Sequence, residues 1–172
     1  MIWLIIPVVI VGLMYAGVFW WLRNPIGAAA STSIEKISVS PEKLREHVEF
    51  LADIEPPRNV DHPDSLERAA AYIEEQWKSQ GFDVTNQHFT DDGKTFRNVV
   101  TAIGPSDASL IVVGAHYDVC GNQPGADDNA SAVAGLLELS YFLKQRESTL
   151  NHRFEFVAYT LEEPPYLSLI HI

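Results

Sequence analysis

The sequence contains a single cysteine, Cys120, among its 172 residues. One cysteine excludes a disulfide bond within the chain and says little about the redox compartment. Basic side chains are also scarce, with 12 Lys and Arg against 23 Asp and Glu, and the formal net charge is −11. Because binding to nucleic acid depends on basic groups that neutralise phosphates, we expect no nucleic-acid partner. The chain contains no internal repeat.

The N-terminal region is an almost unbroken apolar run over residues 2–22, with aromatic residues near its two ends. About 20 apolar residues are what a helix needs to cross the hydrocarbon core of a bilayer. Residues 1–23 are therefore predicted as a transmembrane helix or signal anchor, which would make this a single-pass membrane protein with its domain on the extracytoplasmic side. Cleavage near Ala28–Ala30 is the alternative and would give a secreted or periplasmic protein. Residues 24–40 are small and polar, as in a linker.

After the linker, helical and strand patterns alternate along the chain. Helices are expected from Pro41, with Ser40 as the N-cap, over 65–80 and over 130–144, and strands are expected from Phe82, over 95–103, over 110–113 and over 154–160. This order predicts an α/β fold, a three-layer αβα sandwich with a mixed β-sheet that is incomplete at the C-terminus. The apolar, β-branched stretch 110–113 is expected to be a strand buried on both faces.

Candidate metal ligands follow two of these strands. His116 and Asp118 come just after the strand at 110–113, Asp128 opens the next helix, and Glu162 and Glu163 follow the last strand. Ligands usually bind at the carboxyl ends of the strands in open α/β sheets. If the two strands are neighbours, all five side chains face one crevice and form a metal site.

Each of these motifs also has an ordinary structural interpretation. His116 and Asp118 could lie on a surface loop, and Asp128 or Asn129 could simply cap the following helix. The pair Glu162–Glu163 could be solvated. Cys120 is interpreted as a loop residue, and His152 and His171 as bystanders rather than ligands.

The stretches GAHYD, PGADDNAS and LEE, in this order, make residues 41–166 resemble the zinc aminopeptidases of metallopeptidase family 28. The resemblance implies that His116 ligates one zinc ion and that Asp118 orients its imidazole. It further implies that Asp128 bridges two zinc ions, that Glu163 binds the second ion, and that Glu162 is the general base.

The function implied by the resemblance is zinc-dependent hydrolysis of peptide bonds, with removal of N-terminal residues from a peptide substrate. Two co-catalytic Zn²⁺ ions and a bridging water would carry out the reaction. One alternative is another zinc amidohydrolase of the same fold, glutaminyl-cyclase-like or carboxypeptidase-like. A non-catalytic binding ectodomain is the other alternative. The oligomeric state is left open.

The chain departs from the family beyond Glu163. Family members supply a further aspartate and a further histidine as zinc ligands, and this sequence contains neither at the expected distance. Residues 167–172 do not resemble the family and are expected to be a non-native tail. Because zinc sites use at least three protein ligands for each ion, we expect this chain alone to bind zinc weakly and to hydrolyse peptides poorly or not at all.

Overall fold

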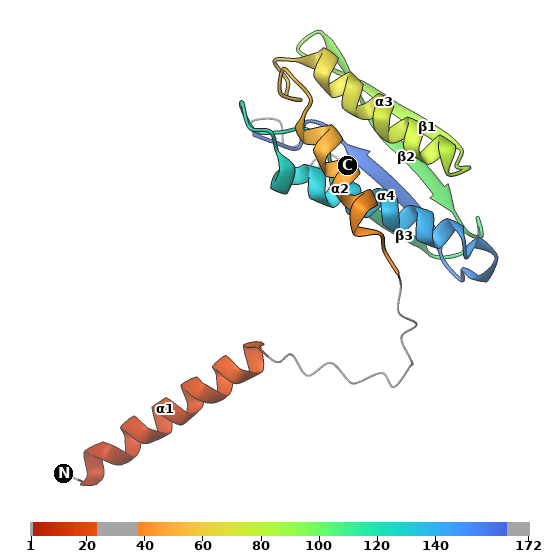
Figure 1. Ribbon diagram of the computed structural model, residues 1–172. Helices are drawn as coiled ribbons and strands as arrows, with labels where there is room; N and C mark the ends of the chain where they lie inside the picture. The colour runs from red at the N-terminus through yellow and green to blue at the C-terminus, as the bar shows by residue number, and fades with distance from the viewer. Residues whose placement is uncertain (1, 24–37, 165–172) are drawn as a thin grey trace. The chain divides into compact units, whose positions relative to one another are not determined.

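The computed structural model describes residues 2–23 and 38–164, with side chains described from residue 11 in the first stretch. The chain divides into two units, residues 1–38 and residues 39–172 (Figure 1). Most of the linker predicted at 24–40 and all of the tail predicted at 167–172 lie outside the described residues.

The first unit contains one long helix, α1 (Ile2–Arg23). A helix therefore forms where the apolar run is, but none of the described helices combines the length and the apolar character that crossing a membrane requires. The transmembrane helix predicted at residues 1–23 is thus not found. An apolar run favours a helix in several environments, so helix formation alone does not establish a membrane span.

The second unit is built on one four-stranded sheet (Figure 1). Its strands are β1 (Val84–Asp91), β2 (Lys94–Ile103), β3 (Leu110–His116) and β4 (Arg153–Tyr159), in the spatial order β1-β2-β4-β3. The pairs β1–β2 and β2–β4 are antiparallel, whereas β3 and β4 are parallel. The predicted α/β fold with a mixed sheet is confirmed.

The helices of this unit pack on one side of the sheet, as Figure 1 shows. They are α2 (Pro41–Ala52), α3 (Pro63–Ser79) and α4 (Ser131–Lys144), with short turns η1 (Ala126–Ala130) and η2 (Glu147–Thr149) at the two ends of α4. Ser40 caps α2 as predicted, because its side chain accepts a hydrogen bond from the Lys43 amide. The larger of two clusters of buried side chains, with Trp77, Leu137 and Phe156 among its members, joins these helices to the sheet.

The strand β3 is only partly covered by the described residues. Leu110, Ile111 and Val112 are 52%, 38% and 51% exposed, so the expectation that this strand is buried on both faces is wrong. The reason is its position, since β3 lies at the edge of the sheet. Residues 38–164 likewise contain no second helical layer, and two of the three predicted layers are seen.

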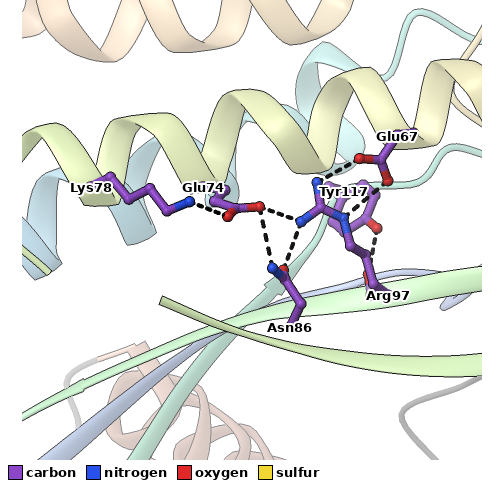
Figure 2. Close-up of polar contacts among 6 residues, drawn as sticks. All are labelled: Glu67, Glu74, Lys78, Asn86, Arg97 and Tyr117. Atoms are coloured by element: carbon purple, nitrogen blue, oxygen red, sulfur yellow. Dashed lines mark hydrogen bonds and ion pairs between the residues drawn. The ribbon is translucent and has the colours of Figure 1, made fainter. Parts of the chain in front are cut away.

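A polar cluster fastens α3 to the sheet (Figure 2). Arg97 of β2 donates two hydrogen bonds to the carboxylate of Glu67, at 3.0 and 2.7 Å, and others to Glu74 and to Oδ1 of Asn86. Lys78 also donates to Glu74, at 2.5 Å. The hydrogen bond from Lys78, and then that from Arg97, lower the pKa of Glu74 to about 2. Glu74 therefore stabilises the folded chain only while it is ionised.

Replacing Glu74 by Gln should lower stability in a pH-dependent manner. The pKa of Glu74 is lower in the folded chain than its ordinary value of 4.5. Its contribution is therefore present above this value and is lost as the pH falls towards 2. We expect Glu74→Gln to be less stable than the natural chain in urea unfolding at about pH 6 and to approach it at about pH 3. The control is Glu75→Gln at the neighbouring exposed position, and equal effects of the two substitutions would contradict the assignment.

Candidate metal centre

The candidate site lies where β3 and β4 end. These strands are parallel neighbours, and His116, the last residue of β3, pairs with Tyr159, the last residue of β4. The segment with Glu162 and Glu163 therefore leaves the sheet at the same edge as His116. The adjacency of the two strands, on which the interpretation of the sequence depended, is confirmed.

His116 is 7% exposed and has carboxylates on both sides of its ring. Its Nε2 lies 3.1 Å from Oδ1 of Asp128 and 3.7 Å from Oε2 of Glu162. Its Nδ1 lies 3.5 Å from Oδ1 of Asp118 and 3.3 Å from the carbonyl oxygen of the same residue. Burial acts to lower the pKa of His116, but the carboxylates, with Asp118 first, outweigh it and raise that pKa.

Asp118 connects the imidazole to the glutamate segment. Its side chain is almost fully buried, and Oδ2 accepts a hydrogen bond from the backbone N–H of Glu163 at 3.0 Å. Within the described part of the chain, Oδ1 accepts no hydrogen bond. The nearest facing donor is Nδ1 of His116, which lies 3.5 Å away and does not meet hydrogen-bonding geometry. An Nδ1–H proton directed at this carboxylate would leave Nε2 free to bind a metal.

Asp128 comes from the turn η1 rather than from a helical N-cap. Its backbone is non-helical, and neither η1 nor α4 begins with a side-chain capping hydrogen bond. The carboxylate of Asp128 is 73% exposed, and it faces His116 instead. The alternative in which Asp128 caps the following helix is therefore wrong.

Three of the predicted ligands come together in space. One donor atom each from His116, Asp128 and Glu163 lies within 4.8 Å of the other two. Ligand atoms of one tetrahedral zinc ion lie roughly 3.4 Å apart, as follows from the usual zinc–ligand distances. The 3.1 Å separation of His116 Nε2 and Asp128 Oδ1 is close to this value.

The electrostatics of the cluster also suit a cation. Partial burial raises the pKa of Glu163. The nearby carboxylates of Asp128, Asp118 and Glu162 raise this pKa further, whereas His116 lowers it. These carboxylates repel one another, and a divalent cation would remove the repulsion. One imidazole and two carboxylates form a ligand set that zinc accepts in catalytic sites. The residues present therefore fit a zinc ion.

Open space lies beside these ligands. Two cavities of about 210 and 260 Å³ both include Glu163 and the exposed Cys120 in their lining. Asp118 and Leu161 line the first cavity, and Asp128 lines the second. The candidate metal centre is thus accessible to a small ligand from the surface.

Two residues that hold the site were not found from the sequence. Tyr117 is fixed between His116 and Asp118, because its hydroxyl donates to the carbonyl of Arg97 at 2.6 Å (Figure 2) and its N–H donates to Tyr159. Arg58, in the loop before α3, donates to the carbonyl of Tyr117 at 2.7 Å. Nothing in the local pattern singles out Arg58, because its partners are 7 to 67 positions away in the sequence.

Comparison with known proteins points to the same family as the sequence motifs. Residues 98–168 match the family model of peptidase family M28, and this range contains His116, Asp118, Asp128, Glu162 and Glu163. The resemblance to peptidase family M28 is confirmed. YfbL of Escherichia coli strain K12, an uncharacterised protein, is 43% identical to the chain over 135 residues, which are 74% of this chain and 41% of YfbL.

Solved structures share the fold of the second unit. Glutaminyl cyclase from Bacteroides thetaiotaomicron, bound to N-acetylhistamine, has a TM-score of 0.62 at 21% identity, over 75% of this chain and 49% of its own. A Zn-dependent exopeptidase from Parabacteroides distasonis has a TM-score of 0.60 at 19% identity, over 73% and 48%. At such identities the likeness concerns the fold. The chain spans about half the length, or less, of these proteins.

Replacing Asp118 by Asn should weaken zinc binding without removing a ligand. The amide keeps the shape but loses the negative charge that faces Nδ1 of His116. Loss of such a partner typically costs about 10–100-fold in metal affinity. Competition titration with a chromophoric chelator measures the change, and Asp127→Asn, at an exposed neighbouring position, is the control. An unchanged affinity in Asp118→Asn would refute the orienting role.

Proposed function

We propose that this protein is a zinc-dependent hydrolase of peptide bonds that removes N-terminal residues from peptides. The observation that carries the proposal is the convergence of His116, Asp128 and Glu163 within 4.8 Å, with Glu162 beside them. The match to peptidase family M28 supports the reaction class. The preference for N-terminal residues is the finer part of the proposal and is based on the sequence resemblance.

His116, Asp128 and Glu163 would hold the metal. A zinc ion bound there would polarise the scissile carbonyl and lower the pKa of a water molecule. Asp118 keeps the imidazole of His116 in one orientation and holds the backbone of Glu163 in place through the hydrogen bond to its N–H. In this way one buried carboxylate positions two of the three ligands.

Glu162 is placed to act as the general base. Its side chain is 31% exposed, and Oε2 lies 3.7 Å from Nε2 of His116, at the edge of the ligand cluster. It is adjacent in sequence to a metal ligand but does not belong to the ligand group. From this position its carboxylate can accept a proton from water and then deliver it to the leaving amine.

A second zinc ion is part of the proposal. Asp128 is the most exposed of the three ligands, and its carboxylate could bridge two ions. The further ligands would be the aspartate and histidine that the family resemblance implies beyond Glu163. Such a pair would give each ion the three protein ligands that zinc sites ordinarily have.

A glutaminyl-cyclase-like reaction is the second candidate, because several solved structures with this fold are glutaminyl cyclases. The two reactions differ in their products. Hydrolysis at the N-terminus releases a free amino acid, whereas cyclisation of an N-terminal glutamine releases ammonia and leaves the peptide length unchanged. Incubation with peptides that begin with leucine or glutamine, followed by mass spectrometry, separates them.

Replacing Glu162 by Gln should leave zinc bound but remove hydrolysis, because the amide cannot accept the proton. We expect loss of at least about 100-fold in the turnover of a leucyl anilide. Metal content is measured on the present chain. Hydrolysis is measured on a longer polypeptide that contains this chain and has the length of YfbL, because the chain spans 41% of that relative.

The matched control is Glu163→Gln, one position further along the same segment. Glu163 belongs to the ligand group, so this substitution should lower zinc content as well as hydrolysis. If Glu162→Gln lost zinc and Glu163→Gln kept it, the two roles would be reversed. Retention of full hydrolysis by Glu162→Gln would exclude it as the base.

A further inference from the structure

We propose that Arg58 is a positioning residue that sets the separation of the two segments carrying His116 and Asp128. This inference rests on the proposed function only in taking these two side chains as metal ligands. The segments are residues 116–118, at the end of β3, and residues 124–128, which lead into α4.

Arg58 is buried, with 1% of its surface exposed, and its guanidinium donates four hydrogen bonds to backbone carbonyl oxygens. Nε donates to Tyr117 at 2.7 Å, Nη1 to Pro124 at 2.6 Å, and Nη2 to Gly125 at 2.7 Å. Nη1 also donates to Leu51, at the end of α2, at 2.7 Å. Three of the four acceptors thus belong to the two ligand-bearing segments, and the guanidinium bridges them.

The backbone of Arg58 strengthens the same connection. Its carbonyl oxygen accepts a hydrogen bond from the N–H of Val119 at 3.0 Å. Together with the bond from Nε to Tyr117, this fixes both the residue before Asp118 and the residue after it. The loop that carries Arg58 is therefore paired with the end of β3 on both sides of Asp118.

The glycine at position 125 shows how closely Arg58 and the Asp128 turn approach. Gly125 has φ = +61°, which favours glycine. A Cβ atom there would lie 2.8 Å from Nη2 of Arg58 and 2.6 Å from the carbonyl oxygen of Asp128. The turn is packed directly against the guanidinium, with no room for a side chain between them.

The need for such a bridge follows from the exposure of Asp128. Its carboxylate is 73% exposed, so packing of its own side chain does not hold it against His116. The 3.1 Å approach of Oδ1 to Nε2 must come from the backbone of the turn. Arg58 fastens that backbone, at Pro124 and Gly125, to the residue that follows His116.

Only an arginine can make this set of contacts. A guanidinium offers five N–H donors in a rigid planar fork, whereas lysine offers a single ammonium group. Burial lowers the pKa of Arg58 to about 10, and the charge of Asp118 opposes that effect. The carbonyl oxygens replace the water that the buried cation has lost.

The experiment compares Arg58→Lys and Arg58→Gln with the control Arg97→Lys in the full 172-residue chain. Arg97 is also a nearly buried arginine with several hydrogen bonds, but its side-chain partners are Glu67, Glu74 and Asn86, outside the metal centre. Thermal unfolding reports the general loss of stability for each variant. Zn²⁺ affinity, the absorption spectrum with Co²⁺ bound, and hydrogen exchange of metal-free chain report the site.

We expect both Arg58 variants to bind Zn²⁺ at least about tenfold more weakly and to change the Co²⁺ spectrum. Amide exchange over residues 124–130 should accelerate by at least about tenfold relative to α3, because the turn has lost its hydrogen bonds to Arg58. Arg97→Lys should lower thermal stability but keep zinc affinity within about twofold.

Unchanged exchange over residues 124–130 in Arg58→Lys and Arg58→Gln would overturn the proposal, as would effects no larger than those of Arg97→Lys. If Arg58→Gln does not fold, Arg58→Lys decides alone, because it keeps the positive charge and changes only the number and geometry of the hydrogen-bond donors. If neither the 172-residue chain nor the longer polypeptide binds zinc, the proposed function fails while the exchange measurement still decides the role of Arg58. Zinc binding without hydrolysis in the longer polypeptide would likewise refute the activity and leave this inference intact.

Discussion

The parallel pairing of β3 and β4 is the constraint on which the candidate site depends. It aligns His116 with Tyr159 and therefore places the segment that follows each strand at the same edge of the sheet. His116 and Glu163 are 47 positions apart in the sequence and meet only because of this pairing. An antiparallel arrangement would send the glutamates to the opposite edge, and no metal could be shared.

Strand pairing brings the ligands near one another, and buried polar groups set their final positions. Asp118 faces His116 and accepts a hydrogen bond from the N–H of Glu163, so one carboxylate contacts two of the proposed ligands. Arg58 connects the end of β3 to the turn of Asp128 through backbone carbonyl oxygens. The ligands with exposed side chains thus depend on groups that are almost completely buried. This division is typical of metal sites, where supporting hydrogen bonds determine geometry as much as the ligands do.

The distribution of burial over the sheet is uneven. The helices α3 and α4 cover one face and bury a continuous core, whereas β3 exposes Leu110, Ile111 and Val112. These β-branched and aliphatic side chains are suited to a strand covered on both faces. The site edge of the same strand, at Ala115 and His116, is buried nevertheless. The order of the candidate metal centre therefore depends on the loops around it and not on complete coverage of the sheet.

The sequence by itself determined the elements and the candidate ligands. The helix cap at Ser40 and the apolar run of β3 act over a few residues, so their local pattern is sufficient to predict them. The ligands could be proposed because the three motifs resemble those of a known family. Only the tertiary structure decided that β3 is an edge strand, that Asp128 faces His116 instead of capping a helix, and that Arg58 spans both segments. These outcomes depend on contacts between residues far apart in the chain, to which no local pattern responds.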